Sequence, residues 1–212
     1  MTPSALALPR RGLYALTPDD AGDIDALVAR VLAVIAGGAA LVQYRDKSAP
    51  GPERRIRAEA LARACHAVGV PLIVNDSVTL AVETGAAGVH LGRDDGPVAD
   101  ARAALGKRAI IGVSCYDSLA RARDAVLAGA DYVAFGSVYP SSTKPAAVRC
   151  PLEVIAAARA ELAVPIVAIG GITPENAQTV VAAGAGLLAV IGALFDRGDG
   201  AAAARAFAPA FT

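Results

Sequence analysis

The sequence has no tryptophan, little other aromatic content and only three cysteines in 212 residues. Cys65, Cys115 and Cys150 lie far apart and form no CxxC pair, so we expect neither a disulfide framework nor a zinc site. The N-terminus lacks the pattern of a signal peptide, and no apolar run approaches the roughly 18–20 residues of a membrane span. Free thiols and the absence of these segments predict a cytoplasmic protein.

The chain also lacks an excess of charge of either sign. Twenty basic and twenty acidic residues give a formal net charge of zero, so no overall field would attract nucleic acid or an anionic membrane. Any anion site must therefore be local. The expected partners are small phosphorylated molecules, and the oligomeric state stays open, with a homo-oligomer as one option.

What the chain does have is a repeat of short apolar runs and alanine-rich helical stretches. Such alternation predicts βαβ units and a parallel sheet. Eight units favour a single α/β domain over residues 1–212 with the (β/α)8 TIM-barrel fold, and a doubly wound open sheet is the alternative. Residues 1–10 are expected to form a flexible N-terminal extension. The predicted strands are 13–17, 41–45, 71–75, 88–92, 109–114, 132–138, 165–171 and 187–192, and the predicted helices are 23–36, 53–68, 77–84, 97–105, 118–128, 151–161, 174–183 and 200–208.

Polar residues collect just after these apolar runs, where a βα barrel places its active site. In "LVQYRDK" (41–47) the alternate residues Gln43, Arg45 and Lys47 share one face of a strand. Arg45 and Lys47, with Lys144 after the sixth strand, are suited to phosphate. The alternative is that each is a solvated surface charge. If the face points into a barrel, the three side chains should lie on the same side as Asp76, Asp95 and Lys144.

Two carboxylates, Asp76 and Asp95, follow consecutive predicted strands. Beside phosphate-binding cations they suit Mg²⁺, which takes one or two protein carboxylates and completes its shell with phosphate oxygens and water. Local alternatives exist: Asp76 or Ser77 would serve as a helix N-cap, and "RDDGP" would serve as a turn. The sequence therefore predicts a Mg²⁺ site with Asp76 and Asp95 as ligands.

Glycines follow the last two strands, at Gly170-Gly171 and at Gly192. Barrels often bind phosphate in these loops, although a glycine pair also suits a tight turn. His90 at a strand end is as compatible with the core as with catalysis, and Cys115 is expected to pack. No activated nucleophile is evident, so catalysis is expected from charge stabilisation and positioning.

Taken together, "VQYRDK", "VNDSVTLAVETGAAGVHLGRDD", "IIGVS", "GSVYPSSTK" and "IVAIGGITPENA" resemble the thiamine-phosphate synthase family, in order over residues 12–195. The resemblance implies a (β/α)8 transferase that joins 4-amino-5-hydroxymethyl-2-methylpyrimidine diphosphate to 4-methyl-5-(2-hydroxyethyl)thiazole phosphate, giving thiamine phosphate and pyrophosphate. It further implies a Mg²⁺-assisted, dissociative substitution through a pyrimidine carbocation.

The resemblance also implies roles for individual positions. Arg45, Lys47 and Lys144 match the positions that hold the diphosphate, with Asn75 and the catalytic candidate Ser114 also near it. Gln43 matches the residue that faces the pyrimidine. Asp76 and Asp95 match the Mg²⁺ ligands. The positions around the thiazole phosphate are Ser141, Thr143, Gly171, Ile191 and Gly192.

Some positions depart from the family pattern. Ser141 and Gly192 replace a more common Thr and Ser, and Arg93 replaces a frequent Gln. The rival interpretations are a thiazole tautomerase-like relative and a non-catalytic barrel that binds a phosphate ligand. The tautomerase would need a His where Tyr116 stands. Whether residues 139–150 close over substrate is not determined by the sequence.

Overall fold

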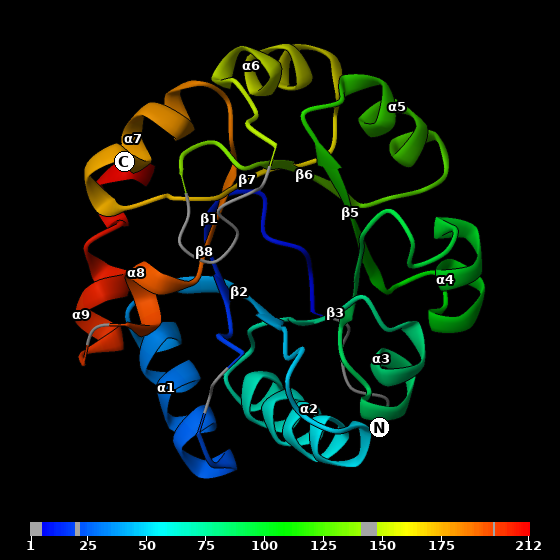
Figure 1. Ribbon diagram of the computed structural model, residues 1–212, viewed down its shortest axis with the longest axis vertical. Coiled ribbons are helices and arrows are strands. Elements are labelled where there is room, and N and C mark those ends of the chain that lie inside the picture. The colour runs from blue at the N-terminus through cyan, green and yellow to red at the C-terminus, as the bar shows by residue number, and fades with distance from the viewer. Residues whose placement is uncertain (1–5, 20–21, 141–147, 197) are drawn as a thin grey trace.

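The computed structural model describes residues 6–19, 22–140, 148–196 and 198–212. Its strands are all parallel and form one closed barrel in sequence order, which confirms the (β/α)8 fold and excludes the open sheet. Figure 1 looks along the barrel, with the strands as an inner ring and the helices around them. The strands are β1 (Gly12–Leu16), β2 (Ala39–Tyr44), β3 (Leu72–Asn75), β4 (Gly88–Leu91), β5 (Ile110–Tyr116), β6 (Tyr132–Gly136), β7 (Ile166–Ile169) and β8 (Leu187–Val190).

The helices follow the strands as the alternating pattern predicts. They are α1 (Ile24–Ala36), α2 (Gly51–Ala67), α3 (Val78–Thr84), α4 (Val98–Leu105), α5 (Leu119–Leu127), α6 (Leu152–Glu161), α7 (Pro174–Ala182), α8 (Gly192–Phe195) and α9 (Gly200–Arg205), with a final 3₁₀ turn η1 (Ala208–Phe211). The single turn α8 was not predicted, because four residues directly after a strand are too short to show helical periodicity. No helix in the described part of the chain is long and apolar enough to cross a membrane.

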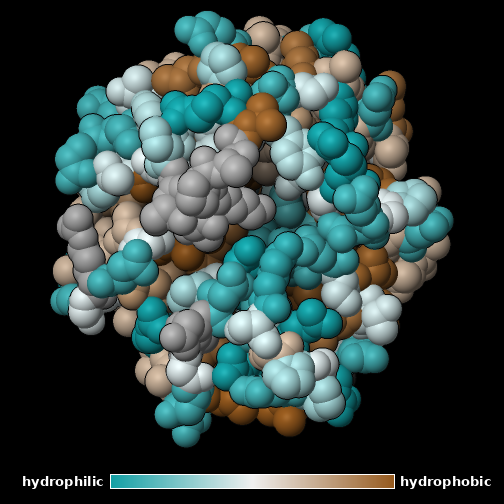
Figure 2. Space-filling view, in the orientation of Figure 1, coloured by the Kyte–Doolittle hydropathy of each residue, from teal (hydrophilic) through white to brown (hydrophobic). Residues whose placement is uncertain are grey.

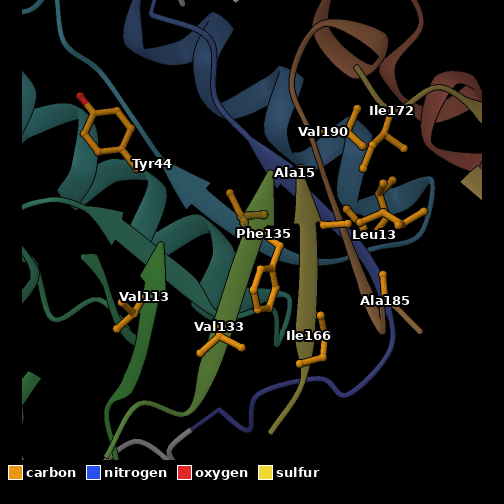
Figure 3. Packing of buried hydrophobic residues seen from close by; sticks show 14 of the residues in the cluster. Leu13, Ala15, Tyr44, Val113, Val133, Phe135, Ile166, Ile172, Ala185 and Val190 are labelled. Carbon is orange, nitrogen blue, oxygen red and sulfur yellow. The ribbon is translucent and has the colours of Figure 1, made fainter. Parts of the chain in front are cut away.

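Two apolar layers hold the barrel together. Residues that alternate outward along the strands pack against the helices, as Val133, Phe135 and Ile166 do in Figure 3. Residues that alternate inward fill the barrel interior, among them Leu41, Ile73 and Val167. Each fully buried side chain of this size contributes about 1.5–3 kcal/mol. The strands are therefore apolar on both faces, and polar residues inside the barrel stand out.

Gly112 on β5 is required by the size of a neighbour inside the barrel. A Cβ at this position would lie 1.9 Å from Cζ of Tyr132, far closer than atoms approach. Tyr132 is fully buried, and its ring occupies the interior space that a side chain at 112 would otherwise fill. A bulky tyrosine can therefore cross the barrel interior at this level.

The amino-terminal end of the barrel is in contact with the segment that precedes β1. Leu8 packs against the interior apolar layer, and Arg10 donates a hydrogen bond to the carbonyl of Ala163 at 3.4 Å. Residues 1–5 of the expected N-terminal extension lie outside the described residues.

Candidate active site

Strand β2 points its alternate residues into the barrel. Leu41 belongs to the interior layer, and the Gln43 side-chain amide donates to the hydroxyl of the interior Tyr14 at 2.7 Å. Tyr44 faces the helices, and Asp46 pairs with Arg57 of α2 at 2.9 Å. Gln43 and Arg45 therefore belong to the inward row, and the acidic Asp46 serves the outer layer.

Arg45 is held by the loop that follows β1. Its guanidinium donates to the Asp19 carboxylate at 2.6 Å, and its backbone amide donates to the hydroxyl of Thr17 at 2.9 Å. The backbone amide of Lys47 donates to the same Asp19 carboxylate at 3.0 Å. Asp19 therefore orients the Arg45 guanidinium and fixes the backbone at Lys47, the two cationic residues that follow β2. Sequence reasoning missed it, although the rule that polar residues after a strand belong to the site points to the "TPDD" that follows β1.

The two predicted metal ligands come together at the carboxyl ends of β3 and β4. The carboxyl of Asp95 interacts with that of Asp76, and Lys47 Nζ lies 3.4 Å from Asp76 Oδ2. Burial raises the pKa of the Asp95 carboxyl, and the nearby Asp76 carboxylate raises it further, against the lowering effect of the Gly92 amide and Lys47. Like charges held this close favour a cation between them.

The sequence offered purely structural roles for these carboxylates, namely a helix N-cap for Asp76 and a turn for Asp95, and the structure shows only the second. Ser77 caps α3 through a hydrogen bond from the Leu80 amide at 3.2 Å, so Asp76 is not the cap. Asp76 instead adopts a φ of 64°, a left-handed conformation that is uncommon outside glycine. Asp95 does close a turn, because its Oδ2 accepts from the Gly92 amide at 2.6 Å. That same carboxylate still interacts with Asp76, so the turn and the acidic pair coexist.

The acidic pair suits a hard divalent cation. Asp76 and Asp95 supply carboxylate oxygens, the ligands that Mg²⁺ prefers, and two such ligands leave room for phosphate oxygens and water. Among the described residues no group of three or more His, Cys, Asp or Glu side chains gathers as a complete protein cage. The donor set therefore fits a cation shared with a phosphorylated ligand.

A row of hydrogen bonds crosses the barrel interior below this site. Ser114 of β5 lies 2.9 Å from Nε2 of His90, and Nδ1 of His90 lies 2.9 Å from the hydroxyl of Tyr132. The Tyr132 hydroxyl lies 2.9 Å from that of Tyr14, which in turn accepts from Gln43. Sequence reasoning missed Tyr14 and Tyr132, since a tyrosine within an apolar strand is typical of a core. His90, which the sequence left open, is both buried and part of this row.

The remaining predicted positions lie at the same end of the barrel. Asn75 ends β3 and, with Lys47 and Asp76, lines a pocket of about 260 Å³ beside α2. Gly171 and Ile191 follow the neighbouring strands β7 and β8, and Gly192 begins α8. Figure 2 views the molecule in the orientation of Figure 1 and shows hydrophilic residues gathered about the centre of this face.

The glycines after β7 and β8 also meet steric demands. A Cβ on Gly171 would lie 2.2 Å from the carbonyl oxygen of Pro140, so the chain after β6 passes directly against it. A Cβ on Gly192 would lie 2.6 Å from Oδ2 of Asp196. Gly170 and Gly171 have φ of 104° and 61°, so the glycine pair does form a turn that other residues rarely adopt. The phosphate prediction for these loops stays untested.

Three predicted positions, Ser141, Thr143 and Lys144, lie outside the described residues. At the edges of that segment, the Ser137 amide donates to the carbonyl of Val148 at 2.9 Å.

Tyr116 ends β5 at the position where the tautomerase interpretation requires a histidine. Its φ is 57°, and its ring lies beneath two guanidinium groups, Arg93 at 4.9 Å and Arg121 at 5.9 Å from the ring centroid. Arg121 also donates to the carbonyl of Ser114 at 2.8 Å. Arg93, the departure noted in the sequence, thus contacts an aromatic ring.

Comparisons with known proteins identify close relatives. A family model described as thiamine monophosphate synthase matches residues 13–194. The thiamine-phosphate synthase of Thioalkalivibrio sulfidiphilus is 55% identical over 201 residues, which is 95% of each chain. That of Methylococcus capsulatus is 54% identical over 94% of this chain and 89% of its own. Among solved structures, a thiamine phosphate pyrophosphorylase from Pyrococcus furiosus superposes with a TM-score of 0.85 at 32% identity, over 95% of this chain and 96% of its own.

Proposed function

The chain belongs to the thiamine monophosphate synthase family and is a transferase of thiamine biosynthesis, and we propose the substrates and the chemistry by which it acts. The proposed substrates are 4-amino-5-hydroxymethyl-2-methylpyrimidine diphosphate and 4-methyl-5-(2-hydroxyethyl)thiazole phosphate. The bond between the pyrimidine methylene carbon and the diphosphate breaks, and its electron pair leaves with pyrophosphate. The thiazole nitrogen then supplies the electron pair of the new carbon–nitrogen bond.

The observation that carries this proposal is the acidic pair beside the cations that follow β2. Asp76 and Asp95 hold like charges together, with Lys47 3.4 Å from Asp76. A site for a neutral ligand has no need of that arrangement, whereas a diphosphate with a divalent cation satisfies both signs of charge. Mg²⁺ held by Asp76 and Asp95 would neutralise charge on the diphosphate and so make it a better leaving group.

In this proposal the chain's own residues bind and stabilise the leaving group. Arg45, already oriented by Asp19, and Lys47 supply positive charge to the diphosphate as its bond to carbon breaks. Ser114 supplies a hydroxyl donor, and Gln43 holds the pyrimidine. Oriented donors in a site shielded from water stabilise developing charge strongly, and this effect commonly contributes most to the rate of such reactions. The sixth-strand loop with Lys144 would add a third cation.

The thiazole phosphate is assigned to the ends of β7 and β8. Gly171, Ile191 and Gly192 bring backbone to this edge of the mouth, and the two glycines add no side chain there. Backbone amides are common phosphate ligands. Ser141 and Thr143 complete the proposed set. Because Gly192 lacks a side chain, its contact with the phosphate is limited to the backbone.

The test is product formation from the two phosphorylated halves with and without Mg²⁺. We expect thiamine phosphate and pyrophosphate to form only with Mg²⁺, and Lys144→Ala to lower the rate by more than about tenfold. Lys107→Ala is the matched control, because exposed Lys107 lies beside the start of β5, at the opposite end of the barrel. Equal turnover in excess EDTA would refute the metal assignment. Isomerisation of a thiazole carboxylate in place of coupling would favour the tautomerase, and binding without turnover would favour a ligand-binding barrel.

A further inference from the structure

The interior row of hydrogen bonds joins residues from five strands. It runs from Gln43 of β2 through Tyr14 of β1, Tyr132 of β6 and His90 of β4 to Ser114 of β5. Its end residues, Gln43 and Ser114, are those assigned to the ligand. Its middle members are buried, with Tyr14 1% and Tyr132 0% exposed. Four successive contacts of 2.7–2.9 Å connect the two ends.

If every buried O–H group in the row has an acceptor, the donor amide at one end sets the direction of each bond. A side-chain amide nitrogen only donates, so the Tyr14 hydroxyl accepts from Gln43 and gives its single proton to Tyr132. Tyr132 then has one proton to give, and its remaining partner in the row is Nδ1 of His90. A neutral imidazole that accepts at Nδ1 carries its proton on Nε2. His90 therefore donates to Ser114 Oγ.

The surroundings keep the two hydroxyl groups protonated and their rings in place. Burial raises the pKa of Tyr14 and of Tyr132 well above the usual value, so each hydroxyl holds one proton at neutral pH. The His90 ring stacks on that of Tyr132 with centroids 5.6 Å apart, and Tyr14 meets Tyr132 edge-on at 6.0 Å. Gly112 leaves the space that Tyr132 occupies.

We propose that Tyr14, Tyr132 and His90 are positioning residues that set the hydrogen-bonding character of the ligand contacts at both ends of the row. Ser114, already an acceptor from His90, is left with its own proton to donate into the mouth. Gln43, already a donor to Tyr14, presents its amide oxygen as an acceptor.

This polarity matches the substrates of the proposed function, on which the ligand assignment rests. The amide oxygen of Gln43 suits an amino group, such as the one that the pyrimidine carries. The Ser114 hydroxyl suits an oxygen of the departing diphosphate, where negative charge grows as the bond breaks. A row with the opposite direction would present a donor to the amino group and an acceptor to the anion, which is repulsive at both ends.

The proton position on His90 tests the row independently of activity. The chain has two histidines, so ¹⁵N-histidine labelling gives a simple spectrum, and His66→Gln, a change on the exposed face of α2, assigns it. We expect the wild-type His90 to carry its proton on Nε2, with Nδ1 bare. Tyr132→Phe removes the donor to Nδ1 and should yield a mixture of tautomers. A wild-type proton on Nδ1 would overturn the proposal.

Kinetics provide the second readout. Tyr132→Phe should lower kcat by about tenfold, with a smaller change in KM. The loss is smaller than that for removing an oriented donor altogether, because the Ser114 hydroxyl is still present but no longer held in one direction. Tyr14→Phe frees the Gln43 amide and should chiefly raise the KM for the pyrimidine substrate. Tyr44→Phe is the control, because it removes a buried tyrosine hydroxyl that bonds Asp46 outside the barrel. It should leave kcat, KM and the His90 tautomer unchanged.

The outcomes separate this proposal from the proposed function. Wild-type kcat and an unchanged tautomer in folded Tyr132→Phe would refute the positioning role. If wild-type protein makes no thiamine phosphate, yet His90 carries its proton on Nε2 and loses that preference in Tyr132→Phe, the row is supported and the proposed function fails.

Discussion

Arg45 and Asp46 are adjacent in the chain just after β2, but Arg45 faces the barrel mouth and Asp46 faces the helices. We predict that replacing Arg45 lowers activity, whereas replacing Asp46 lowers stability. The Asp46 side chain is 1% exposed and accepts from Arg57 at 2.9 Å and from the backbone amides of Ser48 and Ala49 at 3.0 and 2.9 Å. Asp46→Asn keeps the size of the side chain but removes the charge that Arg57 faces. The variant should therefore lose stability and keep its activity.

The size of that loss follows from the burial of the pair. Breaking a buried ion pair by removing one partner costs about 3–5 kcal/mol. Arg57 retains Glu53 at 2.6 Å, so the lower end applies, about 3 kcal/mol. At about 2–4 °C per kcal/mol for a domain of this size, Tm should fall by about 6–12 °C.

The pH dependence of stability gives an additional check on Asp46. Burial raises the pKa of its carboxyl, but the hydrogen bonds from Ala49, Ser48 and Arg57 outweigh burial and hold the pKa below its usual value. The resulting stabilisation is complete above the unfolded pKa of about 3.9 and is lost as pH falls through the lower folded value. The Asp46→Asn variant should lack this part of the acid-side decline.

Arg45→Met should show the opposite profile. Its partner Asp19 is 40% exposed and stays hydrated when the guanidinium is removed, so the ion pair contributes about 0–1 kcal/mol to stability. Turnover should fall by about tenfold or more, because a cation is lost from the proposed leaving-group site. Thermal melts followed by circular dichroism and initial rates of coupling at saturating Mg²⁺ measure both quantities. A large fall in Tm with near-normal turnover for Arg45→Met would contradict the assignment of the two faces, as would normal Tm with lost turnover for Asp46→Asn.

Two further predictions concern the acidic pair and the barrel interior. Asp95→Asn removes the charge repulsion from Asp76 and should abolish coupling activity. The raised pKa of the Asp95 carboxyl makes the wild type less stable as pH rises through that pKa, so at neutral pH without Mg²⁺ the Tm of the variant should equal or exceed that of wild type. Adding Mg²⁺ should raise the Tm of the wild type only. A lower metal-free Tm in Asp95→Asn would count against the repulsion. Gly112→Ala should destabilise by about 3 kcal/mol or more in denaturant titrations, because its Cβ would lie 1.9 Å from Cζ of Tyr132; a loss below about 1 kcal/mol would show that Tyr132 moves aside easily.

Much of the fold was predictable because its signals are local. Apolar runs, helix caps and the glycines between helix and strand recur along the chain, and each constrains backbone within a few residues. Ser77 illustrates the limit of such signals. Both Asp76 and Ser77 suited the N-cap of α3, and the hydrogen bond from Leu80 shows that Ser77 takes it. The missed turn α8 is too short for any periodic pattern to mark.

The sequence by itself determined the order of the elements, the alternation along β2 and the chemical types gathered after the strands. Period-two alternation in a closed barrel requires Gln43 and Arg45 to share a face, and the joint motifs identify the family. These features depend on neighbours in the chain or on the ends of parallel strands, which always meet at one edge.

Only the tertiary structure decided which side chains meet across the barrel. Tyr14 and Tyr132 lie 118 residues apart and on strands that are not neighbours, yet their hydroxyls are 2.9 Å apart. Asp19, in the loop that follows β1, likewise reaches Arg45 from 26 residues away in the sequence. Alternation states which face a residue occupies, but the partner it finds there depends on barrel closure and on the space that small residues such as Gly112 leave. The direction of the hydrogen bonds in the interior is for that reason a property of the folded barrel.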